Sequence, residues 1–151
     1  MKNKKKLTVE VMEMFEIGKY KGYNKRYLIK NWIREYQLPI YNVQLAVFIG
    51  DKQQFLDYTK RKYHITYESF DGQGGYYQSV GEMPDMIYLP KFSWDLQDIL
   101  VITHELLHFV FHALGNAGIS LDRQSEEAFT YAMTEIQEQV FADLLKLKVK
   151  E

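Results

Sequence analysis

Residues 103–108 read Thr-His-Glu-Leu-Leu-His and lie within the mostly apolar stretch 99–110, Ile-Leu-Val-Ile-Thr-His-Glu-Leu-Leu-His-Phe-Val. The stretch predicts a buried helix from about residue 96 to residue 114, because its apolar residues would cover nearly every side of a helix. Four residues of an α-helix turn the chain through ~400°, so His104 and His108 stand on one face, about one turn apart. The fold is therefore expected to form around this helix and to present two imidazoles side by side.

The pair His104 and His108 can hold one zinc ion, because imidazoles one turn apart can converge at the ~2.0–2.1 Å that a Zn–N bond requires. Glu105 lies ~100° round the helix from His104, too far from that face to be a third ligand. It is placed to take a proton from a metal-bound water, whose pKa zinc lowers towards ~7. Unpaired charges in an apolar medium cost several kcal/mol. The set therefore indicates a zinc site in preference to two core histidines bonded to neighbouring strands.

The third ligand is expected from the helix that follows. His112 continues the series, but it lies ~12 Å from His104 along a straight helix and suits the negative end of the helix dipole instead. Glu126 and Glu127 open the last predicted helix, which a short turn folds back as an αα-hairpin. We favour Glu127, with Glu126 as the alternative; the glutamate that is not a ligand complements the helix N-terminus.

Composition indicates a single domain over residues 1–151, with residues 1–6 as a disordered basic tail. The formal net charge of −1 gives no electrostatic case for nucleic acid or an acidic membrane surface. The absence of cysteine leaves His, Glu and Asp as the strong metal ligands. No signal peptide or membrane span is predicted, so the expected location is the cytoplasm, or the host cytoplasm if a phage encodes the chain.

The remaining pattern predicts an α+β fold with a small, mostly antiparallel sheet. Residues 7–17 and 27–35 suit either a strand or a helix. Other expected elements are a strand at 43–49, a helix at 51–62 capped by Asp51, a hairpin of 65–70 with 76–80 through the glycines at 71–75, and a strand at 86–89. Ser93 or Asp95 is expected to cap the helix at 96–114 and Gly115 to end it, while Asp122 or Ser125 caps a last helix to about residue 147.

The sequence HELLH followed by SEEAFTY resembles the gluzincin arrangement of zinc metallopeptidases. It is more closely similar to small zincin-like proteins of phages and mobile elements, and more distantly to the ImmA/IrrE peptidases. The resemblance covers about residues 87–145 and implies a minimal zincin-like fold, with His104, His108 and Glu127 as ligands and Glu105 as general base. Leu107 departs from the ImmA/IrrE pattern, which usually has glycine before the second histidine.

These observations favour a zinc metallopeptidase that binds a peptide or protein substrate. Residues 86–89 are expected to be an edge strand that binds substrate backbone. Tyr131, one turn after Glu127, is a candidate to donate a hydrogen bond to an oxyanion, and Tyr76, Tyr77 and Tyr88 are weaker candidates. Histidine and carboxylate ligands also accept manganese, iron or nickel.

The alternative is a non-catalytic phage or mobile-element binding protein in which zinc joins the two helices. A structural zinc site needs a fourth protein ligand, for which His112, His64 and Asp122 are the candidates. Neither reading predicts an oligomeric state, a substrate or a host partner.

Overall fold

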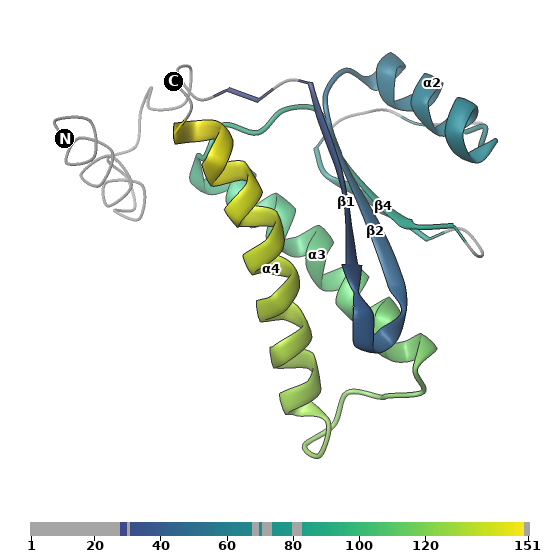
Figure 1. The fold of residues 1–151 in the computed structure, drawn as a ribbon, viewed down its shortest axis with the longest axis vertical. Coiled ribbons are helices and arrows are strands. Elements are labelled where there is room, and N and C mark those ends of the chain that lie inside the picture. Colours follow the sequence, from purple (N-terminus) through teal and green to yellow (C-terminus); the bar gives the residue numbers. More distant parts are fainter. Residues whose placement is uncertain (1–27, 30, 68–69, 71–73, 80–82, 150–151) are drawn as a thin grey trace, which may run out of the picture.

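The computed structural model describes residues 28–29, 31–67, 70, 74–79 and 83–149; the predictions for residues 1–6 and 7–17 lie outside them. Four strands form one sheet: β1 (Trp32–Leu38), β2 (Val43–Ile49), β3 (Tyr76–Gln78) and β4 (Asp85–Leu89). Three α-helices pack against it: α2 (Lys52–Tyr63), α3 (Leu96–Asn116) and α4 (Glu126–Val149) (Figure 1). The predicted α+β class, with two long C-terminal helices, is confirmed.

The sheet has the strand order β1-β2-β4-β3 and is mixed. β1 pairs antiparallel with β2, β2 pairs parallel with β4, and β3 pairs antiparallel with β4. β4 therefore lies inside the sheet, and the prediction that residues 86–89 form an edge strand is wrong. All five residues of β4 are buried, as expected of a strand covered on both faces. Within the part of the chain that the structure describes, β3 is the strand at this edge of the sheet.

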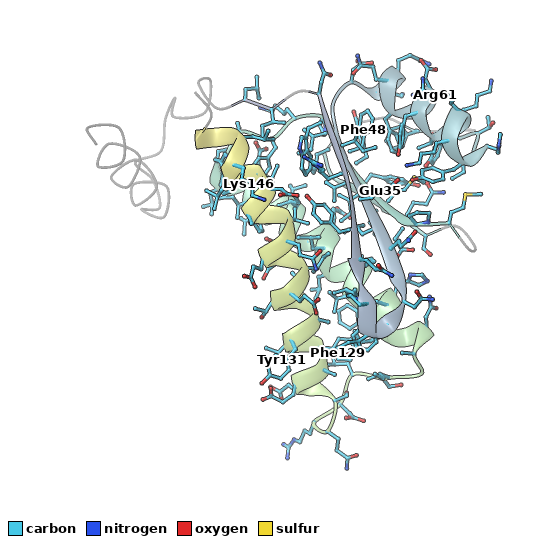
Figure 2. The ribbon with its side chains drawn as sticks, in the orientation of Figure 1. Glu35, Phe48, Arg61, Phe129, Tyr131 and Lys146 are labelled. Carbon is cyan, nitrogen blue, oxygen red and sulfur yellow. The ribbon has the colours of Figure 1, made fainter. Side chains whose placement is uncertain are left out.

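Alternate residues of the sheet face two different layers, as the period of two in a strand requires. Leu45, Val47 and Ile49 of β2 join the large core with α3 and α4. Between them, Phe48 points to the opposite face, where its ring lies 5.5 Å from that of Phe55 on α2 (Figure 2). The sheet is thus the middle layer between α2 and the pair α3 and α4.

The helix α2 begins where the sequence predicts. Asp51 Oδ1 accepts hydrogen bonds from the backbone N–H groups of Gln53 and Gln54, which confirms the N-cap. The predicted hairpin partner of β3 is wrong, because residues 65–67 have no strand conformation and β3 pairs with β4. The chain after α2 instead returns to the outer face of the sheet, where Tyr67 and Phe70 pack on Phe55.

The helix α3 is the central element of the core. Asp95 is its N-cap, accepting from the backbone N–H of Asp98. The predicted end at Gly115 is wrong: α3 continues through Asn116, and Gly118, with φ of 74°, makes the turn. By length and composition α3 is able to cross a membrane, as are the core helices of many folded domains. Here Ile102, Leu106 and Phe109 are fully buried in the core.

α4 runs back along α3 and completes the core. Its buried residues Ala132, Ile136, Val140 and Leu144 recur at helical spacing on one side. The rings of Phe111 on α3 and Phe129 on α4 lie 5.2 Å apart, which fixes the relative height of the two helices.

Candidate metal centre

His104 and His108 stand together on the exposed side of α3. Their Nε2 atoms are 3.1 Å apart, and their ring centroids are 4.8 Å apart. Two nitrogens bound to one tetrahedral zinc at ~2.05 Å lie ~3.3 Å from each other. The two imidazoles therefore fit the first two positions of a zinc site, and both residues are exposed.

Glu105 lies beside the pair but on the buried flank of α3, where its residue is 8% exposed. Burial raises the pKa of its carboxyl above the ordinary value, while the charges of His104 and His108 act in the opposite direction. A carboxyl whose pKa is raised towards neutrality is a better proton acceptor than an exposed one. The residue between the two imidazoles thus has the properties of a general base.

The backbone of Gly75, just before β3, passes directly over Glu105. A Cβ at Gly75 would lie 3.1 Å from both Cγ and Oε1 of Glu105, and it would overlap Cγ1 of Val101. Only glycine allows the chain this close to α3. The approach brings the edge strand β3 alongside the glutamate.

Tyr77 of β3 contacts His108 of the pair. Its ring stacks on that of His108, with centroids 5.6 Å apart and 17° between the ring planes. The Tyr77 hydroxyl donates to Oδ2 of the buried Asp85 at 2.6 Å. Burial raises the pKa of the Tyr77 phenol most, and the hydrogen bond to Asp85 raises it further. Tyr77 is therefore held at both ends, and it limits the orientations that the His108 ring can adopt.

Glu126 and Glu127 are both exposed at the start of α4. The structure does not bring either to the histidines: within the described ranges, no three His, Cys, Asp or Glu side chains gather as a set that could hold a metal. Glu127 as third ligand therefore stays a prediction.

The helix α3 extends two turns beyond His108 before the chain reverses, and Glu126 and Glu127 stand at the start of α4, after that reversal.

Tyr131 does not reach the pair either. It is 71% exposed, and Figure 2 shows it on the side of α4 opposite Phe129, which faces α3. The predicted fourth-ligand candidates are also elsewhere. His112 bonds Asp85, Asp122 accepts from backbone N–H groups in the α3–α4 turn, and His64 is the C-cap of α2.

Sequence reasoning missed the roles of Gly75 and Asp85. The glycines at 74 and 75 suggested a turn, and no sequence signal distinguishes a glycine that turns the chain from one that contacts a helix. Asp85 is an acid in a buried strand, 1% exposed, which is unusual without a partner. That burial could not be inferred because the strand was expected at the sheet edge.

Comparison of the chain with protein-family models, with curated proteins and with solved structures finds no match. The functional argument therefore depends on the geometry of the site itself.

Proposed function

We propose that this protein is a zinc-dependent metallopeptidase with a minimal zincin-like fold. The observation that carries the proposal is the convergence of the His104 and His108 Nε2 atoms at 3.1 Å, with the buried Glu105 on the neighbouring flank of the same helix. Zinc held by such a pair supplies Lewis acidity and lowers the pKa of bound water towards ~7. Glu127 is retained as the proposed third ligand.

In this proposal Glu105 moves one proton. Its carboxylate takes a proton from the attacking water while the oxygen of that water bonds to the carbonyl carbon of the peptide. The same carboxyl then gives the proton to the leaving nitrogen as the C–N bond breaks, so the products are an acid and an amine. The raised pKa of Glu105 favours both halves of this transfer.

The edge strand β3 is the proposed substrate-binding strand. Among the described residues β3 pairs only with β4, so its outer backbone groups are proposed to pair with an extended peptide, as in β-strand addition. Gly75 sets this strand against Glu105, so a peptide paired with β3 runs past the general base. This role replaces the one expected for residues 86–89.

The test is hydrolysis of a quenched fluorescent peptide library by wild-type protein loaded with zinc, and by Glu105→Gln. The variant should keep its bound zinc and lose cleavage by about 10²–10⁴-fold. Glu138→Gln, an exposed change on α4, is the matched control and should cleave like wild type. Full cleavage by the zinc-loaded Glu105→Gln protein would refute the proposed mechanism.

The second candidate is a non-catalytic binding protein in which zinc orders the helix pair. One observation favours it: large apolar side chains around the histidines are exposed, with Leu107 at 42%, Phe111 at 43% and Leu100 at 55%. Exposed apolar clusters mark surfaces that bind other proteins. Zinc binding with no cleavage of any library peptide, together with a fourth protein ligand in the zinc-bound structure, would favour this candidate.

A further inference from the structure

Three side chains beyond the histidine pair form one hydrogen-bonded series. Asp85 Oδ2 is 2.6 Å from His112 Nδ1, and His112 Nε2 is 3.1 Å from Ser79 Oγ. Asp85 belongs to β4 and His112 to α3, and Ser79 directly follows β3. The packing of the sheet against α3 therefore brings the three side chains together. An acid, an imidazole and a hydroxyl bonded in this order form the arrangement that activates a serine for nucleophilic attack.

The hydrogen bonds determine the tautomer of His112. The Asp85 carboxylate can only accept, so Nδ1 carries the proton and Nε2 is left with a lone pair. The Ser79 hydroxyl and the Asn116 amide each lie 3.1 Å from Nε2, and either can donate to that one lone pair. This is the tautomer in which an imidazole can remove the proton from a serine.

Asp85 is fixed more firmly than either partner. Its side chain is 2% exposed, and the Tyr77 hydroxyl donates to the same Oδ2 at 2.6 Å. His112 is 30% exposed and Ser79 is exposed, so the series runs from the core to solvent. The buried Asp85 therefore orients the His112 ring, and the exposed Ser79 is accessible to a substrate.

A cavity of about 370 Å³ adjoins the series, within the 300–1,000 Å³ range of small-molecule sites. Asp85, His112 and Asn116 line the cavity on the side of the series, Asn42 and Gln44 add polar groups, and Val43, Met83 and Pro84 supply a smaller apolar surface. Ser79 lies outside the lining, within hydrogen-bond distance of His112 Nε2. The wall residues that the structure describes include no Lys or Arg to bind an anion, and Asp85 would repel one. The mostly polar cavity therefore suits a small uncharged group that can form hydrogen bonds.

We propose that Ser79, His112 and Asp85 form a second hydrolytic site, independent of zinc, that cleaves small uncharged carboxylic esters. Ser79 Oγ bonds to the ester carbonyl carbon while its proton passes to His112 Nε2. The C–O bond of the ester then breaks, and His112 protonates the departing alcohol. Water attacks the acyl-serine, gives its proton to His112 and releases the carboxylic acid as Ser79 regains a proton. Asp85 is a positioning residue.

The experiment measures labelling by a fluorophosphonate probe, mapped by mass spectrometry, together with hydrolysis of p-nitrophenyl acetate. Wild-type protein should carry the label on Ser79, with or without a zinc chelator. Ser79→Ala should lose both the label and ester hydrolysis, and His112→Gln should slow labelling of Ser79 by about 10²-fold or more. Ser79 and His112 are not in the core, so both variants should fold.

Ser120→Ala removes another exposed serine and is the matched control, with labelling expected at the wild-type rate. The proposal is overturned if wild-type Ser79 takes no label, or if His112→Gln is labelled as fast as wild type. Chelator-sensitive hydrolysis that survives in Ser79→Ala would assign the esterase activity to the histidine pair instead.

Discussion

Glu105 is the residue on which the proposed peptidase chemistry depends, and its burial disfavours the charged form of its carboxyl. Glu105 is 8% exposed, and the loss of hydration on burial raises the pKa of its carboxyl. The close passage of Gly75 covers it from the sheet side. A buried acid with a raised pKa beside two imidazoles is typical of functional sites.

Gly75→Ala should destabilise the fold by about 1–3 kcal/mol, because the added methyl overlaps Val101 Cγ1 in a packed region. The measurement is the free energy of unfolding in urea. Adding Val101→Ala removes the overlapping methyl, so the double variant should recover part of the loss and give a favourable coupling energy.

Gly115→Ala is the control for this experiment. A Cβ at this helical glycine meets nothing within 4 Å, so the change should leave stability unchanged or raise it by up to about 1 kcal/mol. Additive effects of Gly75→Ala and Val101→Ala would contradict the close contact between β3 and α3.

Tyr77 separates two contributions to the site, because its ring stacks on His108 and its hydroxyl bonds Asp85. Tyr77→Leu should weaken zinc binding by about tenfold or more, since the His108 ring loses its support. Tyr77→Phe keeps the stack and should retain most of the affinity. The measurement is competition with a coloured zinc chelator; equal affinity in Tyr77→Leu and wild type would contradict the positioning role.

At the scale of elements, α3 and its neighbours show what sequence can and cannot predict. The pattern of residues 96–114 predicted α3, because helix periodicity is local. Asp51 was predicted as a cap and Asp95 as one of two candidates, because capping is local too. The predicted edge position of β4 and the predicted hairpin partner of β3 were wrong, because strand order depends on pairings between residues distant in sequence. The relative height of α3 and α4 depends likewise on the Phe111–Phe129 contact.

The third-ligand prediction belongs to this scale, because it depends on how α4 lies along α3. If Glu127 completes the site, Glu127→Ala should weaken zinc binding by about 10²-fold or more while Glu126→Ala stays near wild type. Both residues are exposed at the start of α4, so each is a matched control for the other. The measurement is the zinc dissociation constant by the same competition assay. Equal small effects of both changes would exclude Glu127 and support a site closed by water or a partner.

On the scale of the whole molecule, the sheet is the middle layer, and different helices cover its two faces. α2 covers one face through an aromatic cluster around Phe55, and the pair α3 and α4 covers the other. The first strand is tied to the last helix, because the Tyr36 hydroxyl donates to Asp143 at 3.1 Å. Residues 107 positions apart thus hold the sheet and α4 together.

Tyr36→Phe removes this link and should cost about 0.5–1.5 kcal/mol of stability at neutral pH. The pKa of Asp143 is lowered in the fold, first by the hydrogen bond from Lys146 and also by that from Tyr36. Its stabilisation is therefore present above the ordinary value of 3.8 and is lost as the pH falls through the lower folded pKa.

The difference between Tyr36→Phe and wild type should consequently shrink as the pH falls below 3.8. Urea unfolding at neutral and acidic pH measures it. Tyr131→Phe, which alters a hydroxyl on a side chain that is 71% exposed, is the control and should match wild type at both pH values. A difference that grows in acid would contradict the link to Asp143.

The most direct test of the central claim, that His104 and His108 share one cation, is the zinc content of purified protein. Wild type and His108→Phe are loaded with zinc, dialysed and measured by elemental analysis; phenylalanine keeps an aromatic ring against Tyr77 and removes the ligand nitrogen. We expect about one zinc per chain in wild type and almost none in the variant. Equal zinc in both proteins, or none in wild type, would contradict the claim.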